Sequence, residues 1–178
     1  MSCVCLGDVS GLTQLHNVVY VVSGKSSIIK TFSADSLSSL GQDIYVEGMK
    51  DPLDIAVCRD DRQLYVADND YCIWRVSADD HSDQEKWLPT ESKVTLHVYT
   101  LSVMSRRLLM TSLQPLSLRE YSTTDRQLLR VVQLPKYVNW LFHGVETTRG
   151  TFVIGHQGTS RIKDQYAVSE LCRLSRAD

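Results

Sequence analysis

Short apolar runs of one kind recur along the chain at nearly constant intervals, and this recurrence restricts its possible folds more than any other feature. With Tyr65 of the run Leu-Tyr-Val-Ala as reference, equivalent positions occur at Tyr20, Leu109 and Phe152. The intervals are 45, 44 and 43 residues. A period of this length without a helical 3.6-residue pattern is typical of β-sheet units that stack on one another. The sequence therefore predicts an all-β repeat architecture.

The clearest copy of the repeat covers residues 52–78. It contains three strand-like runs, Leu53–Cys58, Leu64–Ala67 and Tyr71–Val76, separated by polar segments that favour turns. A meander of this size cannot bury both of its faces alone, so its copies have to pack against one another. The aliphatic side chains expected to face neighbouring blades are Ile55, Val57, Leu64, Val66, Ile73 and Val76.

This copy also resembles an NHL repeat. Its opening, Asp51–Val57, is similar to the family's P-x-G-I-A-V, with Asp54 where the family usually has glycine. Its core, Leu64–Asn69, and its closing run, Ile73–Val76, are similar to the family's L-Y-V-A-D and R-I. The resemblance implies a six-bladed, TolB-like β-propeller, of which this chain would hold about four repeats.

The aspartate that ends the core pattern, Asp68, is expected to have a structural role. A short acidic side chain at the end of a strand accepts hydrogen bonds from nearby backbone N–H groups and so caps a turn. The other three copies carry Ser23, Ser112 and Gly155 at this position. We therefore expect Asp68 to stabilise the turn between the second and third strands of its blade rather than to bind a ligand.

The predicted fold class is all-β, built from propeller blades that are four-stranded antiparallel meanders. The expected blades cover residues 8–51, 52–94, 95–138 and 139–178, the last of them incomplete. Because propellers close with about four to eight blades, the predicted ring is incomplete or open. The favoured interpretation is a fragment of a longer propeller; the alternatives are that a second chain completes the ring or that residues 3–6 supply the missing outer strand.

Composition narrows the functional classes further. The 178 residues are 43% apolar and 22% charged, as in globular proteins, and no apolar run is long enough to cross a membrane. The first residues lack the pattern of a signal peptide. Five cysteines without regular spacing favour reduced thiols over disulfides. We therefore expect a soluble cytoplasmic protein that makes no membrane contact.

Catalytic motifs are absent from the sequence. It has no G-x-S-x-G nucleophile elbow, no P-loop and no G-x-G-x-x-G dinucleotide motif. Cys3 and Cys5 form a C-x-C pair, but no second pair follows at metal-binding spacing. No cluster of carboxylates accompanies His143 and His156. We therefore expect no enzymatic activity, no cofactor and no bound metal.

The favoured function is a non-enzymatic scaffold that binds a protein or peptide partner. In a propeller, the turns after the second strands and the links into the next blades lie on one face. The candidate binding residues expected there are Lys25, Asn69, Asp70, Tyr71, Lys136, Tyr137, Trp140, His156 and Gln157. The tryptophans Trp74, Trp87 and Trp140 are expected mainly to pack between blades. The NHL resemblance implies protein or RNA contacts, in some members within tripartite-motif ubiquitin ligases.

Two other functions stay open at this point. A metal-dependent lactonase- or lyase-like enzyme of the six-bladed class would need a divalent metal held by side chains from several blades. RNA binding would use the basic half of the chain, since residues 90–178 hold 12 Lys and Arg against 7 Asp and Glu. The basic residues considered are Arg106, Arg107, Arg126, Arg130, Lys136, Arg149, Arg161 and Lys163. Self-association that completes the ring would be compatible with any of these functions.

Overall fold

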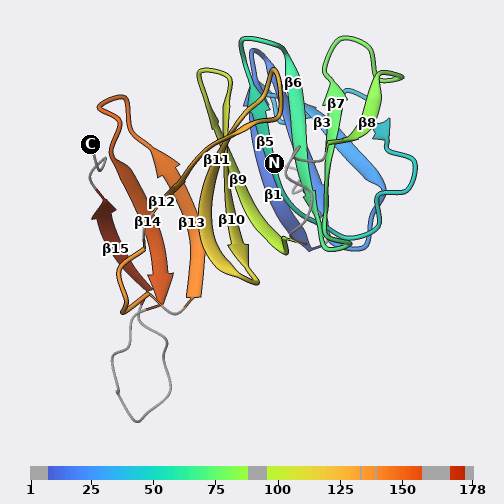
Figure 1. Cartoon of the computed structure of the whole chain (residues 1–178). Helices are drawn as coiled ribbons and strands as arrows, with labels where there is room; N and C mark the ends of the chain where they lie inside the picture. The colour runs from blue at the N-terminus through green and yellow to red at the C-terminus, as the bar shows by residue number, and fades with distance from the viewer. Residues whose placement is uncertain (1–7, 88–95, 133, 139, 158–168, 175–178) are drawn as a thin grey trace. The chain divides into compact units, whose positions relative to one another are not determined.

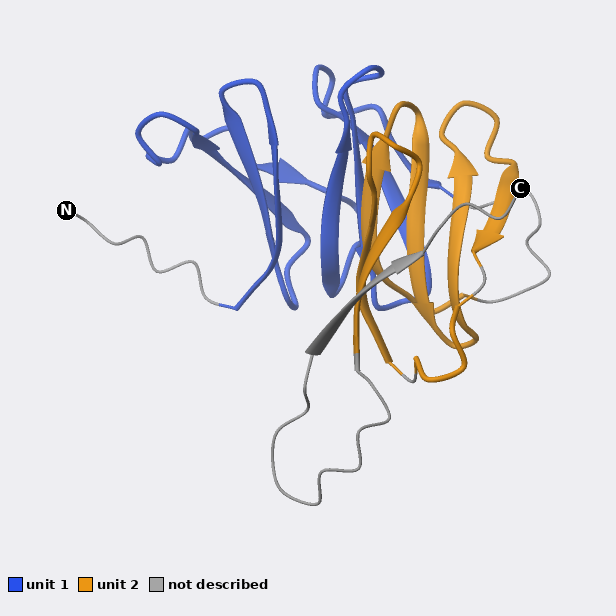
Figure 2. Cartoon of the chain, turned by 90° about the vertical axis from the view of Figure 1, so that its left-hand side faces the viewer, with its two compact units in different colours: residues 1–87 blue, residues 88–178 orange. Residues whose placement is uncertain are grey.

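The computed structural model describes residues 8–87, 96–132, 134–138, 140–157 and 169–174. The chain divides into two compact units, residues 1–87 and residues 88–178 (Figure 2). In both units the regular structure of the described residues consists of β-strands. The expectation of an all-β chain is confirmed.

Unit 1 contains two four-stranded sheets (Figure 1). The first consists of β1 (Val9–Leu15), β2 (Val18–Ser23), β3 (Ile28–Ser33) and β4 (Ile44–Tyr45). The second consists of β5 (Pro52–Cys58), β6 (Gln63–Asp68), β7 (Cys72–Ser77) and β8 (Gln84–Trp87). In each sheet the strands lie in sequence order and every neighbouring pair is antiparallel. Both sheets are therefore meanders of the kind expected for propeller blades.

Unit 2 contains one four-stranded sheet and one sheet with three described strands. The first consists of β9 (Val98–Met104), β10 (Arg107–Leu113), β11 (Leu116–Ser122) and β12 (Leu128–Val132). The second consists of β13 (Trp140–Glu146), β14 (Phe152–Gln157) and β15 (Ser169–Leu174). These strands also pair antiparallel in sequence order.

One local prediction is wrong. His156 and Gln157 are expected in the turn after the second strand of the fourth blade, but β14 continues through Gln157. Gly155 lies inside the sheet, where it pairs with His143 on one side and Leu171 on the other. Glycine often occurs in turns, but strand pairing on both sides accommodates it here.

A β-bulge at the same place in each sheet gives the structural alignment of the four repeats. Next to each bulge, the second-strand residue is Ser23, Asp68, Ser112 or His156. The fourth copy was therefore aligned one residue too early in the sequence. His156, not Gly155, is equivalent to Asp68, and by the same shift Val153, not Phe152, is equivalent to Tyr65.

The core of unit 1 lies between its two sheets. Tyr20, Val22 and Ile29 of the first sheet pack with aliphatic side chains of the second. Gly11 brings β1 close to β5, since a Cβ atom on Gly11 would lie 2.9 Å from the Cα atom of Asp54. Of the six aliphatic residues predicted to face neighbouring blades, five belong to this core or pack against it: Ile55, Val57, Leu64, Val66 and Val76. The sixth, Ile73, pairs with Ala67 on the opposite face of its sheet.

In unit 2, an apolar core and a ring of ion pairs join the two sheets. Leu109 and Leu118 pack with Leu141, Phe152 and Ile154. Beside this core, two arginines alternate with two glutamates whose side chains are 3–4% exposed. The members of this charged ring are Arg107, Glu120, Arg130 and Glu146. Each carboxylate contacts both guanidinium groups, so the ring compensates its own buried charges.

Replacing Leu64 by alanine is expected to destabilise the protein by about 2–5 kcal/mol, because this fully buried side chain fills the space between the two sheets of unit 1. The matched control is Leu12→Ala, since Leu12 is 66% exposed. Its effect is expected to stay within about 0.5 kcal/mol. Urea unfolding followed by circular dichroism measures both values. Equal unfolding midpoints for the two variants would show that the core assigned to unit 1 is wrong.

Candidate functional site

At one end of unit 1, three segments from different parts of its sequence meet. They are the β2–β3 turn, the link between β4 and β5, and the β6–β7 turn. The Asp51 carboxylate in the link accepts hydrogen bonds from the backbone N–H of Lys25 (2.9 Å) and from the side-chain amide of Asn69 (3.0 Å). The backbone N–H of Asn69 also donates to the Asp51 carbonyl (3.0 Å). One aspartate therefore connects both turns to the link.

The buried side chain of Asp68 holds the same link between β4 and β5 by hydrogen bonds. Its carboxylate is fully buried and accepts hydrogen bonds from the backbone N–H groups of Lys50 (3.0 Å) and Asp51 (2.9 Å). It also accepts one from the indole N–H of Trp74 (3.1 Å). The structural role predicted for Asp68 is thus supported, but its partners are different. It holds the link before β5 instead of capping the β6–β7 turn, because at the bulge Asp68 lies opposite Pro52, where the link enters β5.

The side chains around this hydrogen-bonded centre are exposed and chemically mixed. Lys50 and Asp70 form a surface ion pair of 2.8 Å. The hydrogen bond from the Lys50 ammonium lowers the pKa of the Asp70 carboxyl, and the same contact raises the pKa of Lys50. Tyr71 is 49% exposed. Lys25 and Tyr71 both have a φ of 60° in their turns, a left-handed conformation that is uncommon for residues other than glycine. We call this set, Lys25, Lys50, Asp51, Asn69, Asp70 and Tyr71, the turn surface.

The turn surface therefore brings together four of the predicted site residues, Lys25, Asn69, Asp70 and Tyr71. Sequence reasoning missed Lys50 and Asp51, which supply an exposed charge and the central acceptor. An available signal was the position of Asp51 directly before Pro52, since acidic residues next to proline commonly organise turns. That signal marks a turn but does not identify its hydrogen-bond partners.

The predicted site residues of unit 2 do not form one surface. Lys136 and Tyr137 are exposed in the link before β13. His156 was predicted in an exposed turn and instead lies in β14 with 1% of its surface exposed. Its ring packs against Tyr137 at a centroid distance of 5.6 Å. His156 is inaccessible because it occupies the buried bulge position that Asp68 occupies in unit 1.

Trp140 pairs with Gln157 at the next step along β13 and β14, so Trp140 lies on the face opposite to His156. Gln157 is therefore in a strand and not in a turn, and its side chain lies outside the described part of the structure. Trp140 is 44% exposed, so the expectation that it packs between blades is wrong for this residue. Trp74 and Trp87 are buried, as expected, and the Trp87 ring meets Tyr65 edge to face at 5.8 Å.

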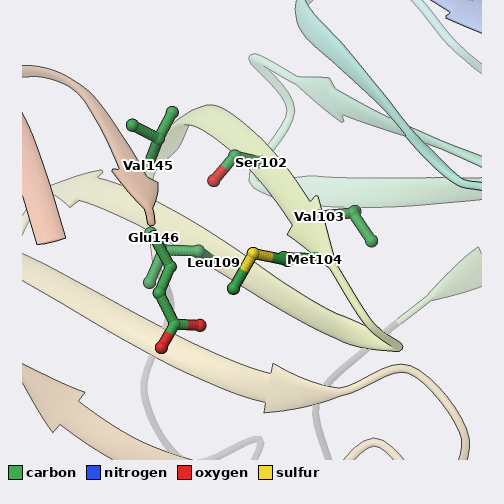
Figure 3. Close-up of a pocket in the computed structure, with 6 residues that line it drawn as sticks. All are labelled: Ser102, Val103, Met104, Leu109, Val145 and Glu146. Carbon is green, nitrogen blue, oxygen red and sulfur yellow. The ribbon is translucent and has the colours of Figure 1, made fainter. Parts of the chain in front are cut away.

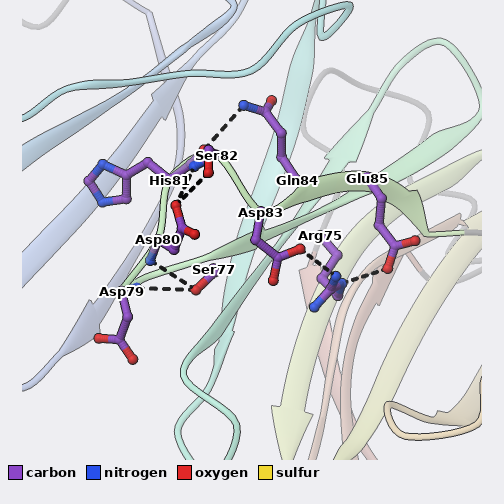
Figure 4. A network of polar contacts seen from close by, with 9 residues as sticks. All are labelled: Arg75, Ser77, Asp79, Asp80, His81, Ser82, Asp83, Gln84 and Glu85. Atoms are coloured by element: carbon purple, nitrogen blue, oxygen red, sulfur yellow. Dashed lines mark hydrogen bonds and ion pairs between the residues drawn. The ribbon is translucent and has the colours of Figure 1, made fainter.

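The opposite end of unit 1 carries a separate polar network around the β7–β8 turn (Figure 4). Arg75 bridges Asp83 (2.9 Å) and Glu85 (2.7 Å). Arg62 donates to both carboxylate oxygens of Asp79, and these hydrogen bonds lower the pKa of that carboxyl. The carboxylates here are paired within the fold, so the network stabilises the turn rather than presenting free acidic groups.

Unit 2 contains a pocket of about 200 Å³ between β9, β10 and β13 (Figure 3). Apolar side chains line most of it, together with Ser102 and Glu146. The Ser102 hydroxyl already donates to the carbonyl of Gly144 (2.8 Å), and Glu146 belongs to the charged ring. The pocket therefore offers neither an activated nucleophile nor an unpaired carboxylate, and none of the predicted site residues lines it.

Within the described ranges, no three His, Cys, Asp or Glu side chains lie close enough together to hold a metal ion. The same part of the chain has no helix that is long and apolar enough to span a membrane.

Comparison with known proteins shows the fold. No protein-family model matches the chain, and no curated protein sequence matches it. Among solved structures, the hydrazine synthase of Kuenenia stuttgartiensis aligns with 86% of this chain at a TM-score of 0.64 and 13% identity. U3-55K aligns with 84% at 0.63 and 15% identity, and the β-propeller domain of Cps50 (Swd1) from Myceliophteria thermophila with 85% at 0.61 and 10% identity.

These similarities establish β-propeller blades as the fold of the chain. The chain spans only 43% of the hydrazine synthase chain, 46% of U3-55K and 50% of the Cps50 propeller domain. Sequence identities of 10–15% carry information about fold alone.

Replacing Asp68 by alanine is expected to destabilise the protein by about 3 kcal/mol, because three N–H donors lose a buried acceptor. Asp68→Asn is expected to cost less, since the amide oxygen still accepts. Hydrogen exchange should show faster exchange of the Lys50 and Asp51 amides in Asp68→Ala. The control is Asp70→Ala, which removes an exposed ion pair and should leave the unfolding midpoint nearly unchanged. If those two amides exchange as in the original protein, Asp68 does not hold the link.

Cys72 is expected to resist alkylation in the folded protein. Burial raises the pKa of its thiol to about 11, and the neighbouring Asp68 carboxylate adds to this effect. At about pH 8 the thiol therefore stays protonated, and the thiolate is the reactive species. Iodoacetamide treatment followed by peptide mass spectrometry should find Cys72 unmodified without denaturant and fully modified in urea. Rapid modification of the folded protein would contradict the burial assigned to this residue.

Proposed function

We propose that the chain is a non-enzymatic β-propeller scaffold that binds a protein or peptide partner through the turn surface of unit 1. The observation that carries this proposal is the hydrogen-bonded centre at Asp51 and Asp68. It fixes the backbone of two turns and one link, while the side chains around it remain exposed.

A surface of this kind suits peptide recognition for a physical reason. Ordering a flexible loop on binding costs free energy, and turns that are already held by internal hydrogen bonds avoid much of this cost. Tyr71 supplies an aromatic contact area, while Lys25, Lys50 and Asp70 supply both signs of charge. Mixed polar and aromatic side chains on a rigid scaffold are the composition commonly found in protein interfaces.

Membership of the NHL-type propellers is part of the proposal. It is supported by the runs Asp51–Val57 and Leu64–Asn69, and by the use of Asp68 to connect the core pattern to the start of the blade. The resemblance favours a protein partner or an RNA partner. The contacts of the basic half weigh against RNA, because Arg107 and Arg130 are committed to Glu120 and Glu146. Their charges are therefore not available for phosphate groups.

The non-enzymatic part of the proposal is supported by the chemistry of the Unit 2 pocket, where the one hydroxyl and the one carboxylate of the lining are already bonded. The fold does not decide the question. One structural neighbour is an enzyme by its name, hydrazine synthase, and this shows only that blades of this kind occur in enzymes as well.

Peptide display on phage tests the turn surface. Peptides selected on the original protein are expected to bind Tyr71→Ala and Lys25→Ala at least about tenfold more weakly, because both side chains project from the fixed turns. The matched control is Tyr45→Ala, since Tyr45 is 61% exposed on β4 and lies outside the turn surface. If every selected peptide binds the turn-surface variants as tightly as the original protein, the partner does not use this surface.

A further inference from the structure

The strand β12 forms the edge of its sheet in unit 2 (Figure 1) and carries exposed apolar side chains. Leu129 is 49% exposed and Val131 is 42% exposed, whereas Arg130 between them is turned inward. Edge strands present unpaired backbone N–H and C=O groups, which allow another extended chain to pair with them. An edge strand that also exposes alternating apolar side chains is a favourable template for this pairing.

The edge strands of unit 1 carry the features by which proteins usually prevent such pairing. The strand β4 has only two residues. The strand β8 has the sequence Gln-Glu-Lys-Trp, in which Glu85 pairs with Arg75 and Lys86 lies over the Trp74 ring at 5.3 Å. In β12, by contrast, five residues contain no proline, glycine or lysine, and a bulge at Leu129 interrupts the pairing with β11. Arg130 and Val131 pair with Glu120 and Arg119 in regular register, so the protection by the bulge is confined to the first part of β12.

The single charge in β12 does not protect the edge either. An inward-pointing charged residue normally opposes pairing, because a second strand would bury it. The Arg130 guanidinium is already bound by Glu120 (2.5 Å) and Glu146 (3.0 Å), and it lies over the Phe152 ring at 4.4 Å. Its charge is compensated within unit 2, so addition of a strand to β12 adds no uncompensated charge.

Arg119 provides a charge for recognition next to the exposed side chains. It lies on β11 directly opposite Val131, on the same face of the sheet. Its Nε donates to the Ser117 hydroxyl (3.3 Å), and no carboxylate among the described residues pairs with it. Arginine is long enough to reach over Val131 towards a strand added beyond β12. A carboxylate on that strand would complete an ion pair that the fold leaves unmade.

We propose that the β12 edge binds an acidic extended peptide segment of a partner protein by β-strand addition. The added strand would place an apolar side chain beside Leu129 and, two residues away on the same face, a carboxylate near Arg119. Backbone hydrogen bonds to β12 would supply affinity, and the apolar and acidic side chains would supply specificity. The β12 edge shares no residue with the turn surface.

The probe is the fluorescently labelled peptide acetyl-Thr-Val-Thr-Glu-Thr-Val-Thr-amide, and fluorescence anisotropy measures its binding to the full chain. Binding is expected to weaken at least about tenfold with Val131→Lys, and to be lost when every peptide amide is N-methylated. Leu12→Lys is the matched control, since Leu12 is an exposed apolar strand residue outside β12. Replacing the peptide's Glu by Lys should weaken binding to the original protein and restore it to Arg119→Glu.

Circular dichroism confirms that each variant is folded before binding is compared. No binding of the probe up to about 1 mM, or binding that Val131→Lys leaves unchanged, would overturn the proposal. Light scattering of the chain alone measures whether it forms a dimer, and so distinguishes a peptide partner from a second copy of the chain. A dimer that Val131→Lys converts to monomer, without binding of the probe, would show that a second copy of the chain occupies this edge and would also overturn it.

Discussion

The need to cover both faces of small antiparallel sheets determines most of this structure. A four-stranded meander buries little surface by itself, so it is stable only when another sheet covers its apolar side chains. In unit 1 the side chains of Leu64, Val66 and Trp74 pack with those of Tyr20 and Val22. In unit 2 Leu109 and Leu118 pack with Phe152 and other residues of the next sheet. Because packing fixes the strands, the turns at their ends can vary in sequence and serve recognition.

The residue next to the bulge differs in type and in hydrogen bonding among the four repeats. Ser23, Asp68, Ser112 and His156 are structurally equivalent, and all four are polar. Asp68 binds two backbone N–H groups of the preceding link and the Trp74 indole, so this link is rigidly held. His156 contacts its link through the Tyr137 ring, and its Nδ1 has no hydrogen-bond partner within the described part of the chain. Among the described residues, His156 therefore does not hold its link through backbone N–H groups as Asp68 does.

The ion pairs in unit 2 change how the basic charge of the C-terminal half is interpreted. The C-terminal half of the sequence has an excess of basic residues, but two of its arginines lie in the charged ring with Glu120 and Glu146. A buried ring of this kind adds little net stability compared with an apolar core, although breaking it is costly. Its clearest effect is local. It keeps the charge of Arg130 inside the sheet and leaves Leu129 and Val131 as the exposed side chains of β12.

The sequence by itself determined the fold class, because the repeat of about 44 residues and the apolar runs around Tyr65 allow strands to be recognised without knowledge of their partners. It also placed Lys25, Asn69, Asp70 and Tyr71 in turns. Only the tertiary structure decided that Asp51 joins these turns and that His156 is buried. The reason is that hydrogen-bond partners and β-bulges depend on the register between strands, and a shift of one residue moves a side chain to the other face of the sheet.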